Sequence, residues 1–166
     1  MNRRHPPSRP ARQRGVAAIE FALIFLLGVL PLLLISFTGA MIFAAQQSLS
    51  LASAEGARAA LQYGTTAQRQ SNACYAAQRS MSWLLAFSGD TPNCGTPTAP
   101  GGAYTAIAVS AASACPSNAT MQCITVVTSF NYNAHPFVPG VSALYGWLMT
   151  SNLSSTATVQ LDLSGS

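Results

Sequence analysis

The sequence is poor in charge: charged side chains make up 7% of its 166 residues, and lysine is absent. Five of the eight arginines lie within the first fourteen positions, and from position 16 onward three arginines stand against four acidic residues. A nucleic-acid-binding protein normally carries its basic residues on the folded domain, where they neutralise phosphates. The basic charge here belongs to a short N-terminal leader, so we expect no nucleic-acid partner.

Charge is missing altogether from Phe21 to Ala45, a mostly apolar run of 25 residues. A membrane-spanning helix needs about 20 such residues, so this run is long enough to cross a bilayer with some tilt. The arginines lie on its N-terminal side, and the positive-inside rule then places the leader in the cytoplasm and the rest of the chain outside. A buried core helix is the alternative, but core helices rarely run this long.

Catalytic motifs are lacking as well. The part of the chain after the apolar run holds no GxSxG, no HExxH and no phosphate-binding loop. Its acidic residues and its one histidine form no pair at a recognisable spacing: Glu55, Asp90, His135 and Asp162. We therefore predict that the protein is not an enzyme and has no cofactor; a small extracytoplasmic enzyme is the least favoured alternative.

Four cysteines lie on the predicted outer side: Cys74, Cys94, Cys115 and Cys123. An even number of cysteines in an oxidising compartment indicates disulfides. Of the three possible connectivities we favour Cys74–Cys94 with Cys115–Cys123. A zinc site is the alternative, but there is no CxxC pair and His135 is the only histidine on that side. We expect no metal.

The first part of the chain predicts one long helix. From Val16 to Tyr63 the 48 residues would extend about 70 Å if they were all helical. Pro31 cannot donate a hydrogen bond to the carbonyl of Leu27, and Gly28 is close by, so we expect a kink there. Gly64 suits the C-terminal cap.

The rest of the chain predicts a mixed fold. A second helix is expected from Thr66 to Phe87, with one face that packs on a core and comprises Ala73, Ala77, Met81, Leu84 and Leu85. Turn-forming residues make 88–103 a loop. Period-2 alternation predicts three half-buried antiparallel strands near 105–110, 124–132 and 156–163, with a Cys115–Cys123 bridge at the mouth of the first hairpin. The spacing of Val141, Leu144 and Leu148 predicts a short amphipathic helix between the second and third strands.

The stretch RQRGVAAIEFALIFLLGVLP joins the basic leader to the apolar helix. The leader ends at Gly15, and Glu20 is the fifth residue after that glycine. This arrangement resembles the class III signal of prepilins, and RGVAAIEFAL is similar to the TadE-like family of minor pseudopilins in tight-adherence pilus systems. AEGARAALQYG resembles the helix that follows the membrane in that family, so the resemblance covers residues 12–64.

The resemblance implies a pilin-like α+β fold: a long N-terminal transmembrane helix, a second helix and a small antiparallel β-sheet. It divides the chain into a basic leader (1–15), a transmembrane and post-membrane helix (16–64) and an extracytoplasmic domain (65–166). It further implies a bacterial inner-membrane protein, single-pass, with a periplasmic C-terminal domain and incorporation in surface pili. The implied partners are a prepilin peptidase, other pilin subunits and the inner-membrane assembly platform.

The chemistry of Gly15, Val16 and Glu20 suits the implied cleavage and the assembly that follows it. A prepilin peptidase would cut between Gly15 and Val16, where glycine leaves the backbone open to close approach. The new α-amino group at Val16 would be charged at neutral pH. Glu20 lies four residues after Val16, and two residues at this spacing are on the same face of a helix. A carboxylate at the edge of the hydrocarbon needs a cationic partner, which in related pilins is the N-terminus of a neighbouring subunit.

Other interpretations of the N-terminus remain open. Glu20 could be an ordinary acidic residue at a helix start, where it favours the helix dipole. A secretory signal peptide could end at Ala52-Ser53-Ala54, before Glu55, but its apolar region would be longer than usual. An uncleaved single-pass scaffold protein of the pilus assembly machinery is the alternative function.

Overall fold

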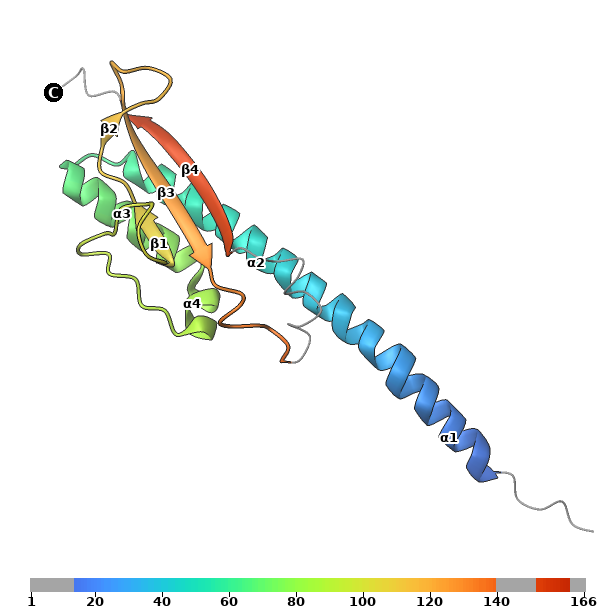
Figure 1. Ribbon diagram of the computed structural model, residues 1–166. Coiled ribbons are helices and arrows are strands. Elements are labelled where there is room, and N and C mark those ends of the chain that lie inside the picture. The colour runs from blue at the N-terminus through green and yellow to red at the C-terminus, as the bar shows by residue number, and fades with distance from the viewer. Residues whose placement is uncertain (1–13, 140–151, 162–166) are drawn as a thin grey trace, which may run out of the picture. The chain divides into compact units, whose positions relative to one another are not determined.

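The computed structural model describes residues 14–139 and 152–161, and the chain divides into two units between Phe37 and Thr38. The elements are helices and a small antiparallel sheet, so the predicted α+β, pilin-like fold is confirmed (Figure 1). The predicted short helix through Val141, Leu144 and Leu148 lies outside the described residues. The predicted domain limits at 15 and 64 concern processing and location, and they stay a prediction.

The N-terminal unit is helical and contains one π-helical turn. Helix α1 (Arg14–Ile24) is followed by the π-helix η1 (Phe25–Val29) and then by α2 (Leu30–Ala60). At the end of η1 the backbone N–H of Leu30 donates to the carbonyl of Phe25, five residues back. A wider turn suits this place because Pro31 has no N–H to donate. The disturbance predicted near Gly28 and Pro31 therefore takes the form of a π-turn.

From Thr38 onward α2 belongs to the folded unit and buries one face. The buried residues recur every three or four positions, which is one side of an α-helix: Thr38, Ile42, Ala45, Leu49, Ala52, Ser53, Gly56, Ala57 and Ala60. The helix ends at Ala60, three residues before the predicted Tyr63. Arg69 explains this end, since its guanidinium donates to the free carbonyls of Ala60 (3.2 Å) and Gly64 (3.1 Å).

The predicted second helix is present as two helices, α3 (Thr66–Ser80) and α4 (Ser82–Ser88). Thr65 and Gln68 form a capping box that begins α3. Met81, at φ −112° and ψ 21°, leaves the helical region and separates α3 from α4. The predicted core face is confirmed, because its five members are all buried: Ala73, Ala77, Met81, Leu84 and Leu85.

The sheet is built around β3 (Gln122–Phe130). On one side β3 pairs antiparallel with β4 (Leu153–Leu161), and on the other it pairs with β1 (Ile107–Val109) and β2 (Ser113–Ala114). The three predicted strands are confirmed, whereas β2 is too short for its alternation to predict it. Burial alternates along β3 and β4, but all of β1 is buried. The loop residue Thr98 pairs with Ala108 in β1, so the outer side of that strand is covered too.

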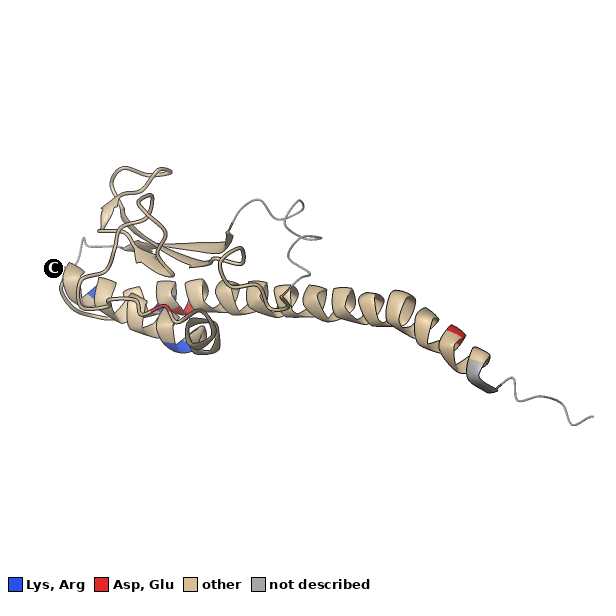
Figure 2. Cartoon of the chain, turned by 60° about the horizontal axis from the view of Figure 1, so that its bottom comes forward, with Lys and Arg blue, Asp and Glu red and all other residues tan. Residues whose placement is uncertain are grey.

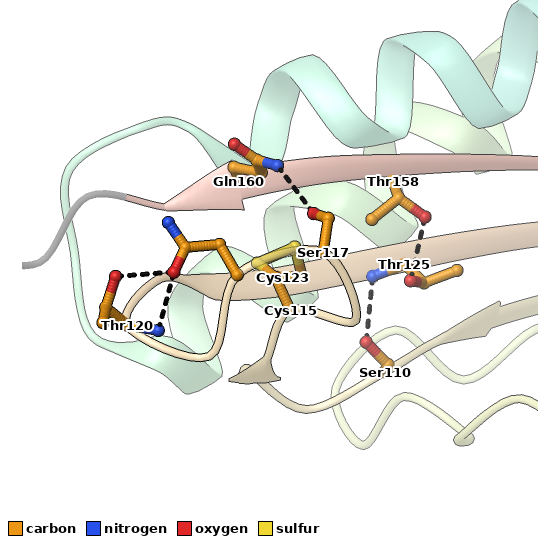
Figure 3. Close-up of a disulfide and its surroundings, with 9 residues drawn as sticks. Ser110, Cys115, Ser117, Thr120, Cys123, Thr125, Thr158 and Gln160 are labelled. Atoms are coloured by element: carbon orange, nitrogen blue, oxygen red, sulfur yellow. Dashed lines mark hydrogen bonds between the residues drawn. A yellow bond between two sulfur atoms is a disulfide. The ribbon is translucent and has the colours of Figure 1, made fainter.

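Two disulfides link the folded unit, in the pairing favoured from the sequence. Cys74–Cys94 joins α3 to the loop after α4, with 5.3 Å between the Cα atoms. Cys115–Cys123 closes the loop between β2 and β3, with 5.0 Å between the Cα atoms (Figure 3). The amide of Cys115 also donates to the carbonyl of Met121 (3.0 Å), so the loop is tied by its backbone as well. Each bridge should contribute about 2–4 kcal/mol by restricting the unfolded chain.

A polar seam fixes α2 against the sheet. The buried hydroxyl of Thr128 donates to the carbonyl of Leu49 (2.9 Å), and the hydroxyls of Ser53 and Ser155 are 3.0 Å apart.

Gly56 marks the place where α2 comes closest to α3 and the sheet. A Cβ atom there would lie 3.0 Å from both the Ala73 carbonyl oxygen and Cγ1 of Val126. The helix α2, the helix α3 and the sheet therefore converge at Gly56, a role that the local sequence around this glycine does not predict.

Substitution Gly56→Val should destabilise the folded unit. The new side chain must enter a space already filled by the α3 backbone and by Val126, and overpacking of this kind costs about 1–3 kcal/mol. Gln47→Val is the matched control, since it places the same side chain on an exposed position of the same helix. Thermal unfolding of the detergent-solubilised chain should show a lower midpoint for Gly56→Val only. Equal midpoints for both variants would contradict the packing role of Gly56.

Substitution Pro31→Ala should restore α-helical hydrogen bonding across η1. Alanine supplies the N–H that proline lacks, so the backbone can return to the bond from residue 31 to the carbonyl of Leu27. Amide exchange in residues 26–31 should slow, while insertion of the helix into vesicles stays the same. Pro139→Ala, outside the helical segment, serves as the control. Unchanged exchange in residues 26–31 would show that Pro31 does not maintain the π-turn.

Candidate functional site: the N-terminal helix

The helical segment Val16–Ala60 contains the candidate site, because its N-terminal part is apolar and exposed. Its most apolar window of 18 residues has a mean hydropathy of 2.7, and none of that window is buried. By length and composition this is the one helix among the described residues that could cross a membrane. From Val16 to Phe37 the helix is 22 residues long, or about 33 Å, which is close to the 30 Å hydrocarbon core of a bilayer.

Large apolar side chains are exposed on every side of this segment. Phe21 and Leu27, for example, are 71% and 73% exposed. Water would disfavour such a surface, since burying a side chain of this size is worth about 1.5–3 kcal/mol. Charge is sparse along the helical segment, as Figure 2 shows. A helix that is hydrophobic all round belongs in an apolar surrounding, either lipid or other helices.

Glu20 is the one acidic residue of the first unit. It is exposed, and it lies one helical turn after Val16, which is 61% exposed. The ion pair found among the described residues is a different one, between Glu55 and Arg58 (2.8 Å), and both of its side chains are in contact with solvent. The described part of the chain thus presents Glu20 as a carboxylate that can take a partner from another molecule.

Gly15 and Val16 lie in the first turn of α1. The helix begins at Arg14, so the bond between these two residues has helical backbone geometry. The first four N–H groups of a helix have no acceptor within it, and its first turn therefore opens at low cost. The backbone at this bond can therefore leave the helical conformation at a lower cost than the backbone in the middle of the helix.

The folded unit offers a second polar region around Asp90 and Tyr104. The Tyr104 hydroxyl donates to the Asp90 carboxylate (3.1 Å), and the Ser88 hydroxyl donates to the same oxygen (2.9 Å). Burial, with the charge of Asp90 as a second cause, raises the pKa of Tyr104 to about 12. The phenol therefore stays protonated at neutral pH and continues to donate. The amide of Asn131 donates to the Tyr104 oxygen in turn (3.2 Å), so the loop is tied to the end of β3.

A shallow cavity of about 280 Å³ borders these two residues, with Asn93 and Thr98 among its lining side chains. Its acidic group is already engaged by two hydroxyls, which suits an anchored loop better than a general base. Among residues 14–139 and 152–161, no three His, Cys, Asp or Glu side chains gather in a way that could hold a metal ion. The N-terminal helix is therefore the stronger candidate site.

Comparison with known proteins also points to the N-terminal helix as the candidate functional site. The model of the TadE-like protein family matches residues 15–58, about a quarter of the chain, which runs from Gly15 through the exposed apolar helix to the tightly packed part of α2. No curated protein and no solved structure matches the chain. The family match, the apolar helix and the α+β fold agree: over residues 15–58 the chain is similar to the TadE-like protein family.

Proposed function

We propose that the protein is a minor pilin, or pseudopilin, of a tight-adherence pilus. A prepilin peptidase cuts it between Gly15 and Val16, and the mature subunit takes part in pilus assembly through its apolar helix. The observation that carries the proposal is the helix from Val16 to Phe37, which is exposed and apolar on all sides directly after the glycine. Such a helix can leave the lipid only if other helices replace the lipid around it.

The orientation in the membrane follows from charge and redox chemistry. The arginines of the leader precede the apolar helix and hold the N-terminus in the cytoplasm. Both disulfides lie after that helix, and disulfides persist in oxidising compartments such as the bacterial periplasm. We therefore assign the protein to the inner membrane as a single-pass protein with its folded unit in the periplasm.

Glu20 sets the position of the subunit during assembly. After cleavage the α-amino group of Val16 carries a positive charge, and Glu20 of one subunit can pair with that group on its neighbour. A carboxylate that enters the apolar region without a cation is strongly disfavoured, and a well-aligned cationic partner offsets part of that cost. The pair would thereby select one depth for each subunit within the pilus. The partners of the subunit are other pilins and the inner-membrane assembly platform.

Substitution Gly15→Leu should block processing, because a bulky side chain next to the scissile bond obstructs the peptidase. An immunoblot of the membrane fraction should then show only full-length precursor. Gly28→Leu is the control: it makes the same change within the apolar helix, where a new Cβ meets no atom within 4 Å, and it should be processed normally. Trimming of Gly15→Leu at Val16, detected by N-terminal sequencing, would refute the role of Gly15 in cleavage. A wild-type chain that keeps Met1 as its first residue would favour an uncleaved scaffold protein.

Substitution Glu20→Ala should reduce incorporation into pili without preventing cleavage after Gly15. The cleavage glycine remains, so the mature form appears, but incorporation into sheared pili should fall because the Val16 amino group loses its partner. An intramembrane charge pair is worth about a few kcal/mol after desolvation, which suffices to exclude a subunit from an assembly. Glu55→Ala removes a carboxylate from an exposed ion pair and should assemble normally. If Glu20→Ala assembles as well as the wild type, Glu20 does not set the position of the subunit.

A further inference from the structure

Two cavities of the folded unit share Tyr104 and Thr105 among their lining residues, and we name them the paired cavities. The first, of about 280 Å³, is the one that borders Asp90. The second, of about 230 Å³, lies where the segment 100–105 meets β1 and β3. All of the described lining residues belong to the folded unit, so the paired cavities do not depend on the position of the N-terminal unit.

The side chain of Tyr104 is held in place between the paired cavities. Its hydroxyl donates to Oδ2 of Asp90 (3.1 Å), has the Ser129 carbonyl as a second acceptor (3.3 Å) and accepts from the amide of Asn131 (3.2 Å). Tyr104 is nevertheless 38% exposed, so its ring is the part that remains for a ligand. A ring fixed by its hydroxyl can stack on a ligand with little further loss of side-chain freedom.

Asp90 supplies a strong hydrogen-bond acceptor to the first cavity. The hydroxyls of Ser88 and Tyr104 both donate to its Oδ2 atom. A carboxylate has about four acceptor sites, so Asp90 can accept further hydrogen bonds from a ligand. Hydrogen bonds to an ionised acceptor are stronger than those between neutral groups. The bound hydroxyls also fix the direction of the carboxylate before a ligand arrives.

The other polar side chains of the paired cavities are hydroxyls and amides. They belong to Thr91, Asn93, Thr98 and Thr105 in the first cavity, and to Ser129 and Asn152 in the second. Among the described lining residues neither cavity has a Lys, Arg or His. An anionic ligand would therefore meet Asp90 without a cation, and an apolar ligand would leave the polar groups without partners. A neutral ligand with many hydroxyl groups meets neither difficulty.

The size of the cavities limits the ligand as well. Each is smaller than the range of about 300–1,000 Å³ that is typical of sites for drug-sized molecules. Gly101 and Gly102 line the second cavity, and a Cβ atom at either position would meet no atom within 4 Å. These glycines leave the second cavity open beside the Tyr104 ring. The space suits a flat ring with small polar substituents.

We propose that the paired cavities are a binding site for a neutral saccharide, in which a sugar ring stacks on Tyr104 while its hydroxyls donate to Asp90. A sugar ring fits this arrangement because its C–H groups form an apolar face and its rim carries hydroxyl donors. The amide of Asn93 and the hydroxyl of Thr98 complete the polar side of the first cavity. The inference goes beyond the proposed function and rests on neither cleavage nor pilus assembly.

Saturation-transfer NMR on the full-length chain tests the proposal. The chain is kept in a polyoxyethylene detergent, because detergents with a sugar headgroup would compete for the site. The probes are the methyl glycosides of glucose, galactose, mannose, N-acetylglucosamine and N-acetylgalactosamine, with tetramethylammonium as a charged control. At least one glycoside should receive saturation, most strongly at the ring C–H protons of one face. No transfer to any glycoside, or transfer to tetramethylammonium alone, would overturn the saccharide site.

Two substitutions of Tyr104 separate stacking from the anchoring of the loop. Tyr104→Ala removes the ring and the hydroxyl and should abolish binding of the glycoside. Tyr104→Phe removes the same hydroxyl contacts but keeps the ring, and it should retain binding. Tyr63→Ala is the control, since Tyr63 is fully exposed and lines neither cavity. Wild-type binding by Tyr104→Ala would place the sugar elsewhere, and loss in Tyr104→Phe as well would overturn the stacking contact.

Substitution Asp90→Asn tests the acceptor. The amide oxygen of asparagine can still accept from Ser88 and Tyr104, so the loop keeps its anchor. One carboxylate oxygen becomes an N–H donor, however, and the hydrogen bond from the sugar to a charged group is lost. The dissociation constant for the glycoside, from titration calorimetry, should rise about tenfold. An unchanged constant would show that Asp90 does not contact the sugar and would overturn the site as proposed.

Discussion

The contact of α2 with α3 and the sheet is the interaction on which the folded unit depends. Most side chains that α2 buries there are small, so the backbones of neighbouring elements come close together, and Gly56 marks the nearest approach. Small side chains each bury little apolar area, and the contact therefore depends on close packing over its whole length. The hydrogen bond from Thr128 to the Leu49 carbonyl and the hydrogen bond between the Ser53 and Ser155 hydroxyls then fix the register of the helix against the strands.

Because of this packing, the two parts of the helical segment Val16–Ala60 have different surroundings. Before Thr38 the apolar side chains are exposed on all sides, whereas after it one face is buried in protein. The residues of the first part suit an apolar surrounding, either lipid or other helices, whereas those of the second part fit against α3 and the sheet. The π-turn lies entirely within the first part, where the surroundings do not impose one fixed packing on it.

Disulfides and hydrogen bonds of side-chain hydroxyls, rather than ion pairs, hold the segments of the folded unit together. The described residues contain one ion pair, and it is exposed, so it contributes little to stability. Two disulfides hold the long loops, and side-chain hydroxyls form bonds at the seam, at Asp90 and between Thr125 and Thr158 (Figure 3). Its disulfides persist in an oxidising compartment. It also presents few charges that would oppose close contact with a membrane or with other subunits.

Elements that rest on local pattern were predictable from the sequence alone. The apolar helix, the buried face of α3 and α4 and the three longer strands follow from periodicity and turn residues. The even cysteine number indicates disulfides, and the favoured pairing joins cysteines that are consecutive in the sequence. The TadE-like motif around Gly15 and Glu20 is likewise a local pattern, and the family match covers it. Each of these features needs only residues that are near one another in the chain.

Features that need distant residues were decided by the tertiary structure. Arg69 ends α2 three residues early by binding carbonyls up to nine residues away, and β2 exists only because β3 offers it a partner. Gly56 appeared as an ordinary helix glycine, yet Ala73 and Val126 leave no room there for a side chain. The exposure of Trp83 beside Ser48 depends in the same way on how α4 packs against α2. Local sequence determined which segments form helices and strands, and contacts between segments determined where they end and which surfaces remain free, because burial is a property of the assembled neighbours.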